Sequence, residues 1–461
     1  MKIEFVQAAA EGEAGFAADN RTVVRPVADS FRGMAEQFCR LGKERGDGCD
    51  ILLDIPGISP ETKMEAARLL VQSLYQGAYR FRRAALKELA GKPLFPARDS
   101  LADYGNGVYR LFSRDDLTAA VAKGEEEGRL IGYARSLGNL PSNYLGTEEF
   151  TCYAAMMAEY RFVRCQIIGE QELSRMGCGG ILSINQGMSQ KAAMAVLTYE
   201  GAPGTPYTAL IGKGVFFDSG GYHLKSMADM EGMKFDMCGA AGMLEAFEAI
   251  AAAKVCINLM AVLPLAENLI GPGAVRMGDV AVMMSGKTVE IYNTDAEGRL
   301  LLADALTYAQ SVGTACLIDL ATLTYSCRNA LGDSFTGGFC NDDGLWEAYC
   351  LAADSAGEPV WRLPLDDSYH RLLARSDCAD LANYAPGTGG GASVAACFLE
   401  EFVREGQRWI HLDAVGPSVI RQETEGMAKG ASGANIASVI RFLEGLGAEK
   451  GGSASVTKGE M

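Results

Sequence analysis

Histidine is scarce in this chain of 461 residues. Only three histidines are present, His223, His370 and His411, and they lie far apart in the sequence. The common zinc site of metalloenzymes needs two histidines on one helix, as in His-Glu-x-x-His, and that pattern is missing. Any metal chemistry in this protein therefore has to depend mainly on carboxylate ligands.

The chain also lacks a long apolar run and a regular cysteine framework. No stretch reaches the roughly 18 to 20 apolar residues that cross a bilayer. The first residues do not combine a basic start with an apolar core, so we expect neither a membrane span nor a signal peptide. The 13 cysteines are odd in number and include no Cys-x-x-Cys pair. Scattered thiols of this kind are typical of a reducing compartment, which predicts a cytoplasmic protein.

Positive charge is in short supply as well. Lys and Arg number 42 against 58 Asp and Glu, which gives a formal net charge of −16. An acidic surface repels phosphate backbones, so nucleic acid is not an expected partner. The hydrophobic fraction of 48% is that of a globular protein, and the length exceeds one ordinary core. We therefore expect two domains.

Apolar runs and amphipathic stretches alternate along the chain, which predicts an α/β protein. Residues 1–122 are typical of a small α/β domain, with a strand at 50–55 and helical spacing over 60–79. A linking helix is predicted at 123–141. The larger domain, residues 142–447, should contain a central, mostly parallel sheet flanked by helices. The tail at 448–461 is rich in Gly, Ser and Lys and is predicted to be disordered.

Several elements of the larger domain can be placed individually. Buried strands are predicted where Val, Ile and Leu are concentrated, at 193–199, 207–212, 255–263, 315–320 and 409–412. Helices are predicted between them, including 239–253 and 300–311. Ligand sites in such folds lie at the carboxyl ends of the strands, and the polar clusters described next fall there.

Carboxylates recur in glycine-rich, apolar sequence at three places in this second half. The first cluster follows the strand 207–212, the second covers residues 225–239, and the third is Asn-Thr-Asp-Ala-Glu-Gly-Arg at 293–299. Carboxylates in such surroundings cost several kcal/mol to bury unless they are paired or bind metal. Two divalent ions would balance the charge of four carboxylates, so the sequence predicts a two-metal hydrolytic site. The four carboxylates are those of Asp218, Asp236, Asp295 and Glu297.

Each of these residues alone has a plainer explanation. An aspartate after a strand commonly caps a helix or a turn. Lys225 alone would be a solvated surface lysine, and Arg299 could pair with any nearby carboxylate. The sequence Gly-Lys-Gly at 212–214 suggests phosphate binding, but the Walker spacing is missing. The prediction of a metal site therefore depends on the co-occurrence of the clusters.

Two regions, 211–241 and 286–304, resemble the signature regions of the leucine aminopeptidase (M17) family almost position by position. The run Asn-Thr-Asp-Ala-Glu-Gly-Arg-Leu at 293–300 is very specific to that family. The similarity extends from about Ala134 to about Leu443. The sequence Asp-Ser-Gly-Gly-Tyr, which begins at Asp218, and the short N-terminal part resemble the bacterial peptidase B branch more than the peptidase A branch.

The resemblance implies a metal-dependent hydrolase, a protease that releases N-terminal amino acids from peptides. It implies that Lys213 binds metal as a neutral amine, although the usual pKa of lysine is about 10.4, so the ion must displace a proton. Asp218 and Glu297 would bridge two divalent ions. Asp236 would share the tighter site with Lys213, and Asp295 would complete the more exchangeable site. Zinc and manganese both suit such ligands.

The resemblance also implies roles for residues that bind no metal. Lys225 would stabilise the oxyanion that forms when a metal-activated water attacks the first peptide carbonyl. Arg299 would hold a bicarbonate ion that serves as the proton shuttle. Met233 would line the pocket for the first side chain of the substrate. The family forms hexamers, each a dimer of trimers, so we expect a homohexamer.

The chain departs from the family pattern at one position near the site. Where many relatives have Leu-Thr-Gly, this chain has Leu-Thr followed by Tyr325, which would narrow the site or change its preference. His223 lies between expected ligands, and we interpret it as a packing residue. Two alternatives are a catalytically inactive structural relative and a DNA-binding accessory protein. The presence of every expected site residue disfavours the first alternative, and the charge of −16 disfavours the second.

Overall fold

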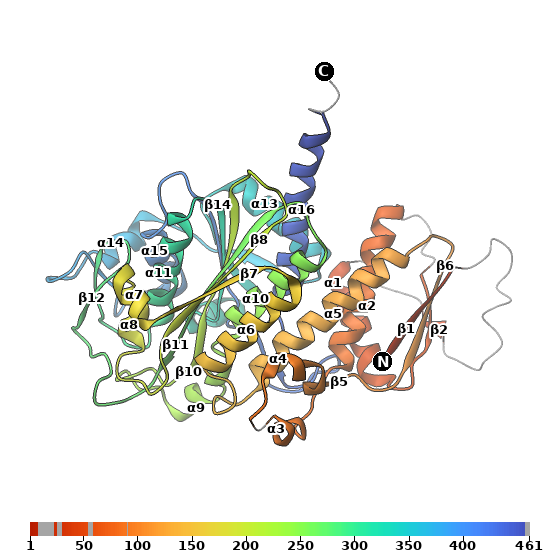
Figure 1. The fold of residues 1–461 in the computed structure, drawn as a ribbon, viewed down its shortest axis with the longest axis horizontal. Helices are drawn as coiled ribbons and strands as arrows, with labels where there is room; N and C mark the ends of the chain where they lie inside the picture. Colours follow the sequence, from red (N-terminus) through yellow and green to blue (C-terminus); the bar gives the residue numbers. More distant parts are fainter. Residues whose placement is uncertain (8–22, 25–29, 54–58, 90, 457–461) are drawn as a thin grey trace.

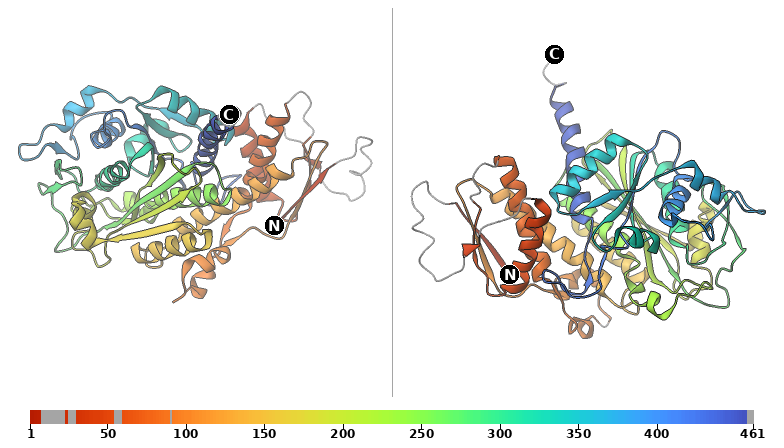
Figure 2. Two further views of the ribbon diagram at one scale, coloured as in Figure 1. Left: turned by 45° about the horizontal axis from the view of Figure 1, so that its top comes forward. Right: turned by 180° about the vertical axis from the view of Figure 1, so that it is seen from behind.

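The chain forms a small N-terminal α/β unit beside a larger unit built on a nine-stranded sheet (Figure 1). Both views in Figure 2 show the red and orange N-terminal unit to one side of the larger one. The computed structural model describes residues 1–7, 23–24, 30–53, 59–89 and 91–456. The predicted fold class, an α/β protein with a small N-terminal unit and a larger unit built on a mostly parallel sheet flanked by helices, is confirmed.

The N-terminal unit packs two helices against a four-stranded parallel sheet in the order β1-β6-β3-β2. Its strands are β1 (Lys2–Gln7), β2 (Val23–Val24), β3 (Asp50–Leu52) and β6 (Val108–Ser113), and its helices are α1 (Phe31–Glu44) and α2 (Pro60–Ala78). Helix α2 begins where the Ser59 side chain accepts a hydrogen bond from the Thr62 amide, with proline in the first turn. This helix confirms the prediction at 60–79. The predicted strand at 50–55 ends at Leu52, and residues 54 and 55 lie outside the described part.

Helix α5 (Thr118–Asn139) joins the two units and packs against both α2 and α10. It begins earlier than the linking helix predicted at 123–141. The buried Arg68 side chain on α2 forms an ion pair with Glu127 on α5. It also pairs with Glu444 near the C-terminus, where Arg68 Nη1 lies 2.7 Å from Glu444 Oε2. Between α2 and β6 the chain forms short elements: β4 (Arg80–Phe81), α3 (Ala85–Glu88), α4 (Leu94–Ala97), η2 (Arg98–Leu101) and β5 (Ala102–Asp103).

The large sheet has the order β16-β15-β18-β14-β9-β11-β8-β7, and β10 pairs with β11. Its centre, β18 to β11, is parallel. The pairs β11–β8, β8–β7 and β18–β15 are antiparallel, and β16 pairs in parallel with β15. The strands are β7 (Arg164–Gly169), β8 (Ala193–Glu200), β9 (Tyr207–Gly212), β10 (Gly214–Asp218), β11 (Asn258–Asn268), β14 (Thr314–Ala321), β15 (Thr336–Cys340), β16 (Val360–Arg362) and β18 (Arg408–Asp413).

Helices cover both faces of this sheet because alternate strand residues point to opposite sides. Leu210 of β9 belongs to the hydrophobic core on one face, and its neighbour Ile211 belongs to the core on the other. The first core also contains residues of α6 (Thr147–Arg161), α10 (Cys238–Ala252), α13 (Asp343–Ser355) and α16 (Ile436–Val456). The second contains residues of α7 (Glu170–Met176), α8 (Gly179–Ile184), α11 (Gly298–Ser311) and α15 (Gly391–Glu400).

The remaining elements surround the carboxyl ends of the parallel strands or lie at the edges of the unit. The strands are β12 (Val280–Val282), β13 (Thr288–Glu290), β17 (Leu381–Ala382), β19 (Val419–Ile420) and β20 (Gly430–Ala431). The helices are α9 (Met227–Met230), η3 (Met233–Phe235), α12 (Tyr325–Leu331) and α14 (Asp367–Leu373). None of the helices within the described ranges is both long and apolar enough to span a lipid bilayer.

The predicted elements at 193–199, 207–212, 315–320, 409–412, 239–253 and 300–311 match observed elements within a few residues. The strand predicted at 255–263 begins later, at Asn258, because the chain leaves α10 through a turn in which Lys254 has a φ of 53°. Helix α16 continues to Val456, so the structure differs there from the disordered tail predicted at 448–461. Residues 457–461 lie outside the described part. The domain boundaries themselves stay a prediction.

Candidate active site

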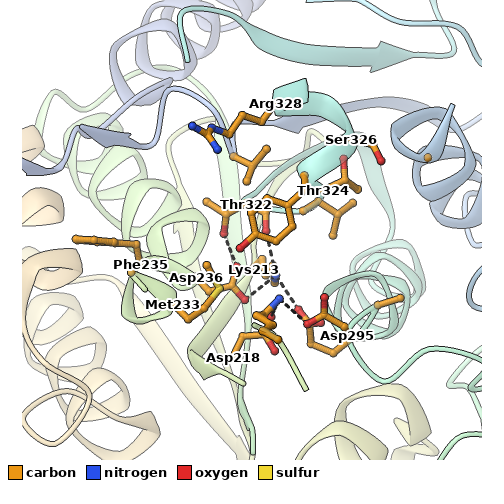
Figure 3. A pocket seen from close by; sticks show the side chains of 18 of the residues that line it. Lys213, Asp218, Met233, Phe235, Asp236, Asp295, Thr322, Thr324, Ser326 and Arg328 are labelled. Carbon is orange, nitrogen blue, oxygen red and sulfur yellow. Dashed lines mark hydrogen bonds and ion pairs between the residues drawn. The ribbon is translucent and has the colours of Figure 1, made fainter. Parts of the chain in front are cut away.

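A cavity of about 680 Å³ opens where the parallel strands β9, β14 and β18 end (Figure 3). This is the position at which open α/β sheets bind ligands. Every site residue predicted from the sequence lines this one cavity: Lys213, Asp218, Lys225, Met233, Asp236, Asp295, Glu297 and Arg299. The structure therefore brings the third cluster, at 293–299, together with the first two, which lie much earlier in the sequence.

Lys213 lies at the base of the cavity, between β9 and β10, with a side chain only 2% exposed. Its Nζ lies 2.7 Å from Asp236 Oδ2 and 2.8 Å from Glu297 Oε1, and it donates to the Thr322 carbonyl oxygen at 3.0 Å. Gly298 makes room for this side chain, because a Cβ at that position would lie 2.5 Å from Lys213 Cε. One ammonium group thus bridges two buried carboxylates.

Lys225 bridges the other two carboxylates of the cluster. Its Nζ lies 2.8 Å from Asp218 Oδ2 and 2.5 Å from Asp295 Oδ1. The Gly220 amide donates to Asp218 Oδ1 at 2.8 Å, in a turn where Gly220 has a φ of 84°. That conformation favours glycine, so the turn after β10 depends on it.

The cluster holds four carboxylates but only these two ammonium groups. Burial raises the pKa of Asp236 to about 8 and the pKa of Asp295 to about 7, and neighbouring carboxylates add to both rises. Burial also acts against ionisation of Glu297, but Lys213 and Lys225 together lower its pKa. The protein therefore concentrates more negative charge than its own lysines neutralise.

The arrangement of the carboxylates fits divalent cations. Oxygen atoms of Asp218, Asp236 and Glu297 lie within 4.8 Å of one another, and all three residues are buried. Glu297 Oε2 has no hydrogen-bond partner in the described part of the chain. A buried carboxylate oxygen without a donor is costly unless a cation binds it. With an excess of negative charge around it, this oxygen supports a metal centre.

Two neutral residues that the sequence analysis missed hold the carboxylates in place. Thr322 Oγ1 donates to Asp236 Oδ1 at 2.7 Å. Asn268 Nδ2 donates to Asp218 Oδ1 at 2.7 Å and to the Thr294 carbonyl oxygen at 3.0 Å. Such supporting contacts orient metal ligands and tune their basicity. Their one sequence signal is position, since each lies at or just past the end of a buried strand, as many residues do.

The loop 293–297 is fixed by an extensive network of hydrogen bonds. Asn383 donates from Nδ2 to the Asn293 carbonyl oxygen at 2.7 Å and accepts at Oδ1 from the Asn293 amide at 3.1 Å. Thr294 Oγ1 donates to the Gly220 carbonyl oxygen at 2.6 Å and accepts from the His223 amide at 2.8 Å. The turn that carries Asp218 and the loop that carries Asp295 are thereby tied together. His223 is bonded to Thr294 and is not among the lining residues of the cavity, as its interpretation as a packing residue requires.

Arg299 is buried in the cavity wall, two residues after Glu297 and in the first turn of helix α11. Its Nη1 donates to the Asn383 carbonyl oxygen at 2.8 Å, and Nε has no hydrogen-bond partner among the described residues. Burial lowers the pKa of Arg299 to about 10. A buried guanidinium that lines a cavity and has an unused donor is suited to binding a small anion.

Tyr325 crosses the cavity from the start of α12. Its ring lies over Lys225, with Nζ 5.4 Å from the ring centroid, and its hydroxyl donates to the Asp229 carbonyl oxygen at 2.8 Å. Met233 lines the same cavity from η3. The tyrosine occupies space beside the lysine, as expected from its size.

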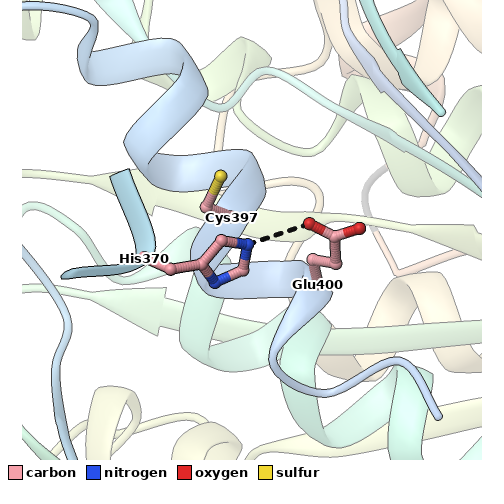
Figure 4. Close-up of side chains that lie close together, drawn as sticks. All are labelled: His370, Cys397 and Glu400. Carbon is pink, nitrogen blue, oxygen red and sulfur yellow. Dashed lines mark hydrogen bonds and ion pairs between the residues drawn. The ribbon is translucent and has the colours of Figure 1, made fainter. Parts of the chain in front are cut away.

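A second group with metal-ligand chemistry, His370, Cys397 and Glu400, lies away from the cavity (Figure 4). Both ring nitrogens of His370 are engaged by carboxylates, Nδ1 with Glu401 at 2.8 Å and Nε2 with Glu400 at 3.0 Å. Burial raises the pKa of the Cys397 thiol to about 11, which disfavours the thiolate that metals bind. We interpret this group as a hydrogen-bonded contact between α14 and the C-terminal end of α15.

Comparison with known proteins agrees with the geometry. The family model described as "Cytosol aminopeptidase family, catalytic domain" matches residues 132–440. A probable cytosol aminopeptidase of Bacillus licheniformis is 36% identical over 421 residues, which cover 90% of this chain and 82% of that protein. One from an Acidovorax species is 43% identical over 325 residues, which cover 70% of this chain and 63% of that protein.

A solved structure is similar along almost the whole chain. It is the bottromycin maturation enzyme BotP, which has a TM-score of 0.80 and 28% sequence identity to this chain. The match covers 97% of this chain and 99% of that one. The likeness therefore includes the N-terminal unit, which lies outside the residues matched by the family model.

Proposed function

Because this chain belongs to the cytosol aminopeptidase (M17) family, we propose that it releases N-terminal amino acids from peptides by two-metal hydrolysis. Membership makes it a metallo-hydrolase that acts on peptide bonds, and the family implies divalent metal ions. The observation that carries the finer proposal is the buried cluster of four carboxylates and two lysines at the base of the cavity.

The metal ligands in this proposal are the residues at the base of that cavity. Lys213 and Asp236 would hold the tighter ion, Asp295 would hold the more exchangeable one, and Asp218 and Glu297 would serve both. The chemistry that two divalent ions, zinc or manganese, would supply there is activation of a water and polarisation of the scissile carbonyl. The unpartnered Glu297 Oε2 supports the assignment, since a cation would satisfy it.

Lys225 acts on the substrate in this proposal. Its ammonium group is held between Asp218 and Asp295, lines the cavity, and is 6% exposed. A fixed cation in a desolvated site stabilises the negative charge that develops on the peptide oxygen in the transition state. The ion pairs position Lys225 before substrate binds, so little reorganisation is needed.

Arg299 holds the anion that moves protons in this proposal. Among the lining residues of the cavity in the described part of the chain there is no histidine, and the carboxylates at its base are assigned to metal. A bicarbonate ion at Arg299 would supply the missing general base. The bond from Nη1 to Asn383 fixes the guanidinium of Arg299, and Nε, which has no partner among the described residues, is a donor left for an oxyanion.

The residues above this cluster would determine which first side chains of the substrate the cavity accepts. Met233 lines the pocket for the first side chain of the substrate, and Tyr325 restricts the space beside it. We further propose a cytoplasmic homohexamer, and a place in the peptidase B branch. The relatives compared above carry the name cytosol aminopeptidase, so the branch assignment depends on the sequence near Asp218.

The proposal can be tested with an aminoacyl amide as substrate. Lys225→Ala and Arg299→Ala should each lower kcat by about 100- to 1000-fold, because each removes a group aimed at the reacting atoms. Bound metal should stay at the wild-type level in both variants. Lys191→Ala removes an exposed, ion-paired lysine far from the cavity and serves as the control.

Chelation provides the second arm of the test. The chelated enzyme should lose activity and regain it on addition of zinc or manganese. Activity that resists complete metal removal, or full activity in both the lysine and arginine variants, would contradict the proposal.

A further inference from the structure

The wall of the cavity opposite the carboxylate cluster carries two arginines that the mechanism does not use. We propose that Arg328 and Arg421 form a subsite for a carboxylate group of the peptide substrate. The inference rests on the proposed function and names its substrate class: short peptides with a free C-terminus, or peptides with an acidic side chain. Both sources offer the same chemical group.

The charge arrangement is the first observation. In a chain of net charge −16, both Arg328 and Arg421 line the cavity. They share a single carboxylate, that of Asp333, whose Oδ1 lies 2.6 Å from Arg328 Nε and 2.9 Å from Arg421 Nη1. Asp333 is not among the lining residues of the cavity, so it pairs with the two guanidinium groups on the side away from the cavity. Two cations against one anion leave this wall with a net positive charge.

The second observation is that Arg421 has hydrogen-bond donors that no described residue uses. Within the described part of the chain it donates three hydrogen bonds, to Asp333, Gly416 and Val419, and all of them use Nη1, which leaves Nε and Nη2 for a ligand. Burial lowers the pKa of Arg421, and the adjacent Arg328 guanidinium adds repulsion against the opposing effect of Asp333. A bound carboxylate would relieve that repulsion and would match the planar fork of a guanidinium.

The distance from the reaction centre suits a short peptide. Tyr325 and Arg328 lie three residues apart on α12 and so share one face of that helix. Tyr325 covers Lys225, and one helical turn, about 5.4 Å, leads from there outward to Arg328. Figure 3 shows Arg328 across the cavity from Asp218 and Asp295, with Thr322 and Thr324 between them. A residue of extended peptide spans about 3.5 Å, so a carboxylate one or two residues beyond the scissile bond comes within reach of an arginine side chain.

Stability alone does not account for the pair. Partly exposed ion pairs contribute little to folding, and the two arginines are 33% and 36% exposed. Placing a second arginine beside the first adds repulsion without adding a second carboxylate. The arrangement is better explained by a ligand that supplies the missing negative charge.

The test compares substrates that differ only in one carboxylate. Leu-Ala is compared with Leu-Ala amide, which probes the C-terminus, and Leu-Glu amide with Leu-Gln amide, which probes a side chain. The enzymes are the wild type, Arg328→Gln and Arg421→Gln. Arg362→Gln is the matched control, because Arg362 is 37% exposed and pairs with Asp343 at 2.7 Å, away from the cavity.

We expect the wild type to favour one carboxylate substrate over its neutral partner by about 10- to 100-fold in kcat/KM, mainly through KM. The two cavity variants should bring that ratio close to one while cleaving the neutral partner at the wild-type rate, and Arg362→Gln should change nothing. The substrate pair that responds identifies whether the C-terminus or a side chain is bound.

The inference is overturned if neither ratio changes in the cavity variants, or if both members of each pair lose activity equally. Failure of the proposed function would look different, since the wild type would then cleave none of the four peptides.

Discussion

Replacing Thr322 by valine should weaken metal binding without disturbing the fold. The Thr322 hydroxyl donates to Asp236 Oδ1 at 2.7 Å, and Lys213 Nζ approaches the same oxygen at 2.8 Å. Valine has nearly the same shape but donates nothing. A hydrogen bond to a charged group contributes about 1.5–3 kcal/mol, which corresponds to about 10- to 100-fold in an equilibrium constant. Loss of contacts that support metal ligands elsewhere weakens metal binding by a similar factor.

Thr314→Val is the matched control for this experiment. Thr314 begins β14, the strand that Thr322 follows, and its buried hydroxyl has no hydrogen-bond partner within the described ranges. The same chemical change there removes no contact with a carboxylate. The apparent metal affinity of both proteins would be measured by competition with a chelator of known affinity, and thermal unfolding of the metal-free proteins would be recorded alongside.

We expect Thr322→Val to bind at least one ion about 10- to 100-fold more weakly than Thr314→Val. Equal affinities in the two variants would refute the reasoning that Asp236 is a ligand whose orientation depends on Thr322. A large loss of stability in metal-free Thr322→Val alone would assign the hydrogen bond to folding and would equally count against it.

Three further predictions concern the same cavity and the assembly. Tyr325→Gly should lower KM for substrates with a bulky first residue relative to substrates with a small one. Tyr325→Phe loses only the hydrogen bond to Asp229 and should keep the wild-type preference. Identical substrate preferences in the wild type and both variants would contradict a role of Tyr325 in specificity. Asn268→Leu, which removes one of the two amide donors to Asp218 Oδ1 and keeps that of Gly220, should cost about 10- to 100-fold in metal affinity, measured by the same chelator competition. Sedimentation should give a hexamer, and a monomer at working concentration would contradict the assembly inferred from the family.

The charged residues of the site could be predicted from the sequence because their chemistry is local. Asp295 and Glu297 stand in an apolar, glycine-rich run, and the co-occurrence of that run with the clusters around Asp218 and Asp236 indicates an unusual role for these carboxylates. The role of Lys213 as a ligand is inferred from the family resemblance. The structure adds the pairing, in which each lysine bridges two carboxylates from different parts of the chain. The sequence therefore indicates which charged residues belong to the site, but which carboxylate pairs with which lysine follows only from the fold.

The neutral donors that hold the carboxylates, Thr322 and Asn268, could not be predicted from the sequence. Strand β10 shows why for Asn268. No strand is predicted at residues 214–218, yet they form β10, whose register places Asp218 opposite Asn268 of β11. That register sets the amide of Asn268 on the carboxylate of Asp218. An asparagine at a strand end has no distinguishing neighbours in sequence, and a strand register is fixed by contacts between distant segments. The site therefore combines two kinds of information: charges that the local sequence specifies, and a frame of neutral donors that exists only once β10 and β11 have paired.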